Sequence, residues 1–229
     1  MAAALLDAGA AVVVTGRDLG RAERAADELS TAHGGTAVGI SLDVRDEASA
    51  DRAASQAVDR LGGLDVLVNN AGIGMRSVNP RFLTEPQPFW DVSPDGFRDL
   101  VATNLTGYFL VARAVAPGFV AAGRGRIVNI TMNHSTMVRA GFVPYGPARA
   151  GAEALSRIMA ADLAGTGVTV NQLLPGGATA SGMIPQDVPA DVRERLLPAD
   201  IMGPPIRWLC SPQAAGIHDQ RIVATEFRP

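Results

Sequence analysis

Short apolar runs alternate with longer amphipathic stretches along the whole chain. Runs rich in β-branched residues and closed by glycine or asparagine predict strands, and the stretches between them predict helices. The predicted strands are Ala11–Thr15, Thr36–Val44, Asp65–Asn69, Arg126–Thr131, Val168–Leu174 and Arg221–Phe227. The predicted helices are Asp18–Ala32, Glu47–Leu61, Gly96–Ala122 and Tyr145–Ala164.

The predicted strands are apolar on both faces, as in parallel sheets that are covered by helices on each side. Strict alternation of strand and helix predicts a doubly wound parallel sheet of the Rossmann type, in the α/β class. We expect residues 1–229 to form one domain. The proline-rich segments Val78–Pro94 and Pro175–Pro205 are interpreted as loops over the carboxyl ends of the strands, where such sheets bind ligands.

The composition and charge of the chain argue against several classes of function. The chain has 229 residues and a formal net charge of −3, so nothing in it favours nucleic acid as a partner. Its single cysteine, Cys210, excludes a disulfide framework and multi-cysteine metal sites, and we predict no metal. The uncharged stretch Leu163–Gln186 could span a bilayer by length, but its glycines and prolines indicate a strand and a loop. We therefore expect a cytoplasmic protein without a membrane partner.

All 20 basic residues are arginine, and the chain contains no lysine. This excludes Schiff-base catalysis, a lysine general base and a phosphate loop of the Walker type.

Five motifs occur in a recognisable order, and together they resemble the short-chain dehydrogenase/reductase family across nearly the whole chain. They are Asn69-Asn70-Ala71-Gly72 after a strand, Asn104 within a helix, Gly125–Ile130 as a strand, Tyr145 at the start of a helix, and Asn171–Gly176. Each motif alone is weak, whereas five in this order are specific. The resemblance implies an oxidoreductase that moves a hydride between a nicotinamide cofactor and a small carbonyl or secondary alcohol substrate.

The resemblance also assigns the cofactor site. Small residues at strand ends let the backbone approach a nucleotide closely. Asp43 is implied to bind the adenine amino group. The cofactor residues implied at strand ends are Asn70, Ala71, Gly72, Pro175 and Gly176.

Arg17 bears on the choice of cofactor. An acidic residue after the second strand of a dinucleotide fold binds ribose hydroxyls, whereas an arginine accommodates a 2′-phosphate. Thr15-Gly16-Arg17 carries no acid at the strand end, which favours NADP, although NAD stays open. A solvated arginine is the alternative interpretation.

The resemblance implies that Tyr145 gives or takes the alcohol proton and that Asn104 orders a water. Two family positions differ in this chain. The lysine four residues after the tyrosine is replaced by Arg149, which keeps the charge but not the compact ammonium. The serine 13 residues before the tyrosine is replaced by Met132, so we expect the adjacent Thr131 to take its role.

The family's first strand and glycine-rich turn have no counterpart here. Met1–Ala10 resembles the end of the helix that follows that turn, so we expect an N-terminally truncated chain. By strand order, the missing strand would be central, between Ala11–Thr15 and Asp65–Asn69. The two hypotheses are thus an NADP-dependent oxidoreductase, as a dimer or tetramer, and a catalytically silent family member that binds a partner.

Overall fold

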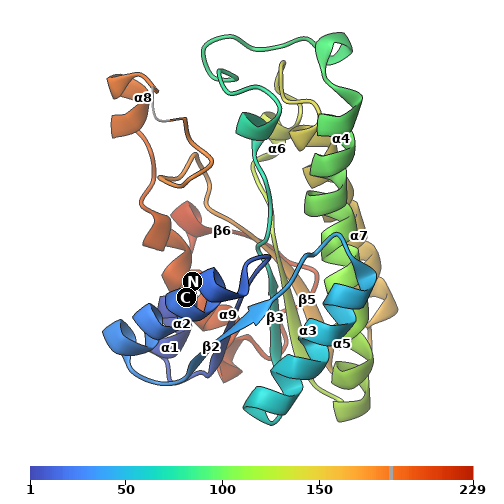
Figure 1. Cartoon of the computed structure of the whole chain (residues 1–229). Helices are drawn as coiled ribbons and strands as arrows, with labels where there is room; N and C mark the ends of the chain where they lie inside the picture. Colours follow the sequence, from blue (N-terminus) through green and yellow to red (C-terminus); the bar gives the residue numbers. More distant parts are fainter. Residues whose placement is uncertain (186–187, 229) are drawn as a thin grey trace.

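The computed structural model describes residues 1–185 and 188–228 (Figure 1). Its strands are β1 (Val12–Gly16), β2 (Ala37–Ser41), β3 (Val66–Asn69), β4 (Gly125–Ile130), β5 (Val168–Leu174) and β6 (Arg221–Val223). Its helices are α1 (Ala2–Leu6), α2 (Leu19–His33), α3 (Glu47–Leu61), α4 (Pro94–Val101), α5 (Gly107–Ala122), α6 (His134–Met137), α7 (Tyr145–Asp162), α8 (Ala190–Glu194) and α9 (Gly203–Leu209). The Rossmann-type α/β class is confirmed.

All strand pairs are parallel, but they form two sheets. One contains β1 and β2, and the other has the order β3-β4-β5-β6. Among the described residues, β1 pairs only with β2, and β3 only with β4. One edge of β1 and one edge of β3 therefore have no strand beside them in this part of the chain.

A shared apolar layer joins the two sheets. Val13 of β1, Ile40 of β2 and Leu67 of β3 all belong to one cluster, which α3 covers. Helix α3 is amphipathic and buries alanines at positions 50, 53 and 57. Its ends are well defined, because Asp46 caps the first turn at the Ser49 amide and Gly62 ends the helix in the left-handed region.

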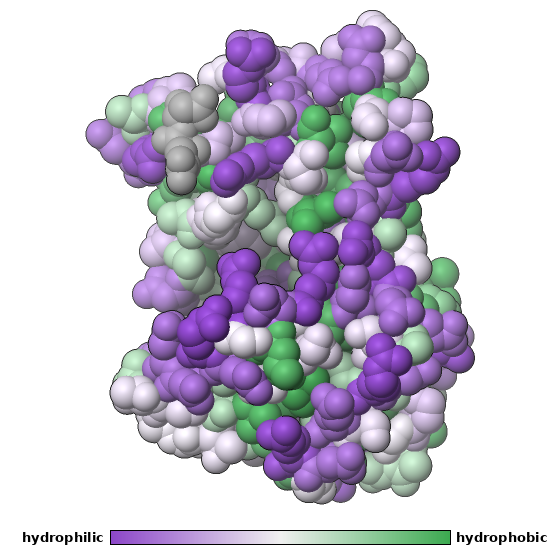
Figure 2. Space-filling model, in the orientation of Figure 1, coloured by the Kyte–Doolittle hydropathy of each residue, from purple (hydrophilic) through white to green (hydrophobic). Residues whose placement is uncertain are grey.

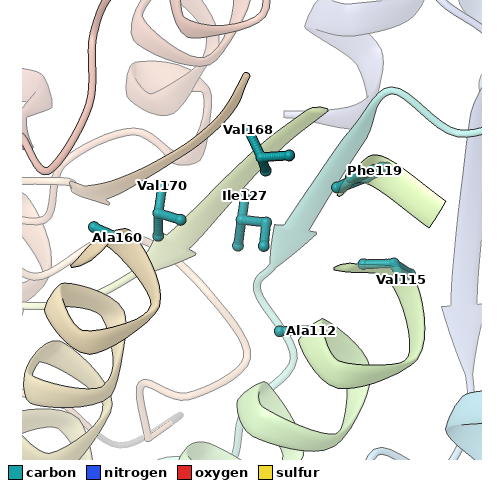
Figure 3. Close-up of a cluster of buried hydrophobic side chains, with 7 residues drawn as sticks. All are labelled: Ala112, Val115, Phe119, Ile127, Ala160, Val168 and Val170. Atoms are coloured by element: carbon teal, nitrogen blue, oxygen red, sulfur yellow. The ribbon is translucent and has the colours of Figure 1, made fainter. Parts of the chain in front are cut away.

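Neighbouring residues of β4 point into opposite apolar layers. Ile127 packs with Val115 and Phe119 of α5 and with Ala160 of α7, as Figure 3 shows. Val128 packs on the other side, in a cluster that contains Ile206 of α9. Helices thus cover both faces of the larger sheet, as expected for strands that are apolar on both faces.

The run Pro94–Ala122 is long and apolar enough to cross a membrane by length and composition alone. Its apolar residues have another explanation, because Val111, Val115 and Phe119 are buried in the two core clusters. It also contains the charged residue Arg113.

Three predicted segments differ from the structure by more than two residues. The strand predicted at Thr36–Val44 ends at Ser41, since its partner β1 ends at Gly16 in the same register. The last strand ends at Val223 instead of Phe227, opposite the end of β5, where Pro175 lacks a donor. The segment interpreted as the loop Pro175–Pro205 also holds α8 and the start of α9, while residues 186–187 lie outside the described part.

The close packing of α2 on β2 gives a testable prediction. A Cβ on Gly39 would lie 2.3 Å from the Glu23 backbone nitrogen, whereas one on Gly118 of α5 would meet nothing within 4 Å. We expect Gly39→Ala to lower the free energy of unfolding by about 1–3 kcal/mol, because α2 must move off the sheet. The matched variant Gly118→Ala should be neutral or stabilising by up to about 1 kcal/mol. Urea denaturation compares the two, and equal stabilities would contradict this packing.

Candidate functional site

Helix α7 presents three polar side chains in a row. Tyr145, Arg149 and Glu153 are spaced four residues apart, so they lie on one face of the helix. The helix starts at Tyr145 and packs against β5 and β4. Its small residues allow this close approach, and Ala148 and Ala152 are buried.

Arg149 is a buried cation, with 3% of its surface exposed. Its Nη1 donates to the Tyr108 hydroxyl at 2.6 Å and to the Ile130 carbonyl at 2.9 Å. The guanidinium carbon lies 5.4 Å from the Tyr108 ring centre and 5.3 Å from that of Tyr145. Within the described residues, no carboxylate forms an ion pair with Arg149, and its Nε has no hydrogen-bond partner. The position thus holds a fixed positive charge between two tyrosines.

Burial and the contacts with the two tyrosines shift the pKa of Arg149 in opposite directions. Burial alone would lower the pKa of Arg149, but the two tyrosine oxygens outweigh it and raise the pKa above its ordinary value. Burial also raises the pKa of Tyr108, which Arg149 only partly offsets. Arg149 therefore remains a cation and Tyr108 remains a neutral phenol at physiological pH.

Asn104 holds the segment that follows β3. It lies in a π-helical turn, Ala102–Thr106, between α4 and α5, and is fully buried. Its Oδ1 accepts from the Ile73 amide at 2.9 Å, and its Nδ2 donates to the Ile73 carbonyl at 2.8 Å. Such π turns are frequent at functional sites. The water-ordering role remains a prediction, whereas this clamp on Ile73 was not predicted.

A cavity of about 750 Å³ lies beside these residues. Figure 2 shows that the molecule is hollowed near the middle of the face in view. Among the predicted site residues, the cavity lining includes Asn70, Ala71, Gly72, Thr131, Tyr145, Arg149 and Pro175. The charged side chains among the described lining residues are Arg76 and Arg149, and that part of the lining contains no carboxylate. No cluster of potential metal ligands occurs in the described residues.

At two predicted site positions, Gly72 and Gly176, the structure leaves no room for a side chain. A Cβ on Gly72 would lie 2.7 Å from Nη2 of Arg149 and 3.2 Å from Oδ1 of Asn104. Gly176 has a φ of +94° and lies against Thr225, where a Cβ would clash. Gly176 is not among the lining residues, although the preceding Pro175 is.

Thr131 belongs to a polar cluster that was only partly predicted. Its Oγ1 donates to Oε1 of Glu153 at 2.7 Å. Arg221 of β6 donates from Nε to the same oxygen at 3.0 Å, and His134 of α6 contacts Oε2 at 2.8 Å. The spacing of four residues between Arg149 and Glu153 could have predicted that Glu153 lies on the same helix face. The approach of Arg221, in contrast, depends on the tertiary fold.

This cluster controls the Glu153 charge. Burial acts to raise the pKa of Glu153, but the hydrogen bonds from Thr131, His134 and Arg221 outweigh it and lower the pKa. The carboxylate is therefore ionised at neutral pH. Since Thr131 has one hydroxyl proton and that proton is directed at Glu153, its hydroxyl can serve a further partner only as an acceptor. The adjacent Met132 side chain packs in an apolar cluster instead.

Arg17 and Asp43 lie apart from the lining residues, at the carboxyl ends of β1 and β2. The Arg45 side chain donates two hydrogen bonds to the Asp43 carboxylate, from Nε to Oδ1 at 3.0 Å and from Nη2 to Oδ2 at 2.7 Å. This pairing lowers the pKa of Asp43 from 3.8 to about 2, with a smaller contribution from the charge of Arg17. A common role of Arg17 and Asp43 in binding a ligand remains a prediction.

The family model described as short chain dehydrogenase matches residues 1–189. A curated relative is the (2S)-[(R)-hydroxy(phenyl)methyl]succinyl-CoA dehydrogenase subunit BbsD of Thauera aromatica, which is 37% identical over 168 residues. That alignment covers 73% of this chain and 63% of the relative.

Two solved structures are similar over 97% of this chain, each with 28% identity. The first is a gluconate 5-dehydrogenase from Burkholderia cenocepacia in complex with NADP and tartrate, with a TM-score of 0.85 and 86% of that chain covered. The second is a 3-ketoacyl-(acyl-carrier-protein) reductase from Brucella melitensis complexed with NADH, with a TM-score of 0.84 and 89% covered.

The pairing of Asp43 with Arg45 predicts a pH-dependent contribution to stability. Because the folded pKa is below the ordinary value of 3.8, the contribution is complete at neutral pH and is lost as the pH falls towards about 2. Asp43→Asn should therefore destabilise the protein at pH 7, with a difference that shrinks between pH 4 and about pH 2. Urea denaturation at several pH values measures it, with Asp51→Asn on α3 as an exposed control. A pH-independent difference would contradict the assigned ion pair.

Proposed function

Because the chain belongs to the short-chain dehydrogenase family, we propose that it transfers a hydride between NADP and a small carbonyl or secondary alcohol. The single observation that carries this proposal is the placement of Tyr145 beside the buried cation of Arg149 in one cavity wall. A phenol beside a fixed cation can give or take a proton at the oxygen of a bound substrate. NAD is the alternative cofactor.

The residues present fit a nicotinamide dinucleotide. Asn70, Ala71 and Gly72 form a wall without bulky side chains, and a Cβ on Gly72 would displace Arg149. The described lining carries two cations and no carboxylate, which suits the anionic diphosphate of a dinucleotide. When bound, the nicotinamide supplies the hydride acceptor or donor. Pro175 and Gly176 would border the same ligand.

Two positions would adapt the family's chemistry to this chain. Arg149 would stand in for the lysine as a charge that orients Tyr145, but it cannot pass on a proton because arginine stays protonated. Thr131 would stand in for the serine, with its proton already bonded to Glu153. Asn104 would hold the backbone of the cavity wall in place through its two hydrogen bonds to Ile73.

Arg17 and Asp43 would hold the adenosine end. Arg17 is exposed at the end of β1 and is free of carboxylate bonds among the described ion pairs, so it can meet a 2′-phosphate. Asp43 keeps acceptor capacity on each oxygen beside its bonds to Arg45.

We also propose a cytoplasmic homo-oligomer. The support for an oligomer is a set of exposed apolar side chains on α5 and α7, where Phe109, Val120 and Ile158 are 43–59% exposed. Small residues on both helices would allow close packing between copies.

The role of Tyr145 predicts a selective loss of turnover. Tyr145→Phe should retain NADPH binding, measured by nucleotide fluorescence, and should lose roughly 10²–10⁴-fold in kcat for ketone reduction. His33→Gln, at an exposed ion pair with Asp7, is the matched surface control. If the wild-type protein binds NADPH but reduces no ketone in a broad panel, the silent partner replaces the enzyme hypothesis. An unchanged kcat in Tyr145→Phe would remove Tyr145 from the chemistry.

The position of Arg17 predicts a cofactor preference. Arg17→Ala should raise the Kd for NADPH about tenfold or more, because a charge-assisted bond to phosphate is lost, while the Kd for NADH should change little. Arg21→Ala on the following helix is the control for general loss of positive charge. Equal weakening of both nucleotides would contradict recognition of the 2′-phosphate by Arg17.

A further inference from the structure

The cavity lining holds a second cation, Arg76, whose surroundings differ from those of Arg149. Arg149 is 3% exposed, and its guanidinium is bonded to a hydroxyl and a carbonyl of the protein. Arg76, in contrast, is an exposed residue of the 3₁₀ turn Met75–Ser77. Its Nη1 donates to the Gly182 carbonyl at 3.1 Å, and among the described residues it forms no other hydrogen bond and no ion pair. Arg76 is therefore a cation of the cavity wall with donors left for a ligand.

The bond to Gly182 leaves the other edge of the Arg76 guanidinium for a ligand. Nε and Nη2 lie side by side on that edge and can donate two parallel hydrogen bonds to a carboxylate or a phosphate. Arg45 shows this geometry in the same chain, because its Nε and Nη2 donate to the two oxygens of Asp43 at 3.0 and 2.7 Å. Arg76 offers the same pair of donors, and no carboxylate of the described residues is paired with it.

The fold attaches Arg76 to two segments of the cavity wall. Its neighbour Met75 anchors the turn after β3, since Met75 is 2% exposed and packs in an apolar cluster. The bond to Gly182 connects this turn to the loop after β5. The same two segments also meet at Gly74, where a Cβ would lie 3.2 Å from the Met183 side chain. Arg76 thus lies where the turn after β3 and the loop after β5 come together.

This position differs from the path of the proposed cofactor. In the proposed function, the dinucleotide extends from Arg17 after β1, past Gly72, to Tyr145. Arg76 follows Gly72 by four residues and contacts the loop after β5, a strand that β4 separates from β3. Arg76 and Tyr145 line one cavity of about 750 Å³, so a small ligand can contact both.

We propose that Arg76 binds an anionic group of the substrate, a carboxylate or a phosphate, while the reacting carbon lies at Tyr145. The inference rests on the proposed function and narrows its substrate class to oxo and hydroxy compounds that carry such a group. Arg76 is thus a specificity-determining residue, and it takes no part in the transfer of the hydride or the proton.

The other groups of the wall suit an anion. The hydroxyl residues Thr179 and Ser181 line the same cavity and can donate to the anion beside Arg76. Ser181 accepts with Oγ from the Met183 amide at 3.4 Å, which leaves its own proton for a ligand. The described lining contains no carboxylate that would repel an anion.

The first test measures recognition without turnover. In the complex with NADP⁺ a ketone cannot be reduced, so isothermal titration calorimetry gives its Kd alone. The wild-type protein should bind 4-oxopentanoate roughly 10–100-fold more tightly than the neutral methyl ester of this acid, because a hydrogen bond to a charged group is added. Hydroxyacetone phosphate and methoxyacetone form a second pair, which shows whether a phosphate is preferred to a carboxylate.

Variants assign this preference to Arg76. Arg76→Gln keeps a donor for Gly182 but lacks the charge, so the anion should bind no better than its neutral counterpart. Arg76→Lys should retain part of the preference, because it keeps the charge without the paired donors. Arg60→Gln, at an exposed arginine in the last turn of α3, is the matched control for lost positive charge.

The second test measures ketone reduction with NADPH. In Arg76→Gln, the KM for the preferred anion should rise by the same roughly 10–100-fold, whereas kcat and the KM for its neutral counterpart should not change. The Kd for NADPH should also stay at the wild-type value, since the cofactor binds elsewhere in the site.

The outcomes separate the inference from the proposed function. Equal Kd values within both pairs in the wild-type protein, or a preference that survives Arg76→Gln, would overturn the role of Arg76. A raised Kd for NADPH in Arg76→Gln would assign Arg76 to the cofactor diphosphate and would also overturn it. Each of these results is compatible with reduction of a neutral ketone. If the anion binds through Arg76 but no ketone of either pair is reduced, the proposed function is contradicted and the anion site stands.

Discussion

Arg149 is the buried charge around which the candidate site is organised. Its guanidinium joins the Tyr108 hydroxyl, the Ile130 carbonyl and the faces of two tyrosine rings, so it links α5, β4 and α7. A buried cation without a carboxylate is costly unless polar oxygens and aromatic faces surround it. These contacts hold the guanidinium against Gly72, with the Tyr145 ring centre 5.3 Å from its central carbon.

The next turn of α7 carries Glu153, a charge of the opposite sign. Arg149 is a cation held by two tyrosines and the Ile130 carbonyl, whereas Glu153 is a carboxylate that bonds Thr131 and His134. The polar groups of α7 thus take part in two separate hydrogen-bond networks, one around Arg149 and one around Glu153.

Periodicity predicted the elements well where local pattern decides structure. Glu47–Leu61 and Val168–Leu174 were predicted to the residue, because caps and flanking glycines mark their ends. The pattern could not reveal α9, whose glycine and two prolines resemble a loop but which buries Ile206 against the sheet. It also could not show that Arg221, 68 residues away, reaches Glu153. A further strand between β1 and β3 remains a prediction, as do the individual site roles.

In the proposed function, residues on both sheets bind one dinucleotide that ends at Tyr145. Hydrogen exchange measured by mass spectrometry, with and without saturating NADPH, tests it directly, because both sheets are read in a single experiment. A shared site should give simultaneous protection at Gly16–Asp18 and Leu42–Arg45, at the ends of β1 and β2, and at Asn70–Gly74 after β3. Protection limited to one sheet, or none at all, would contradict a shared site.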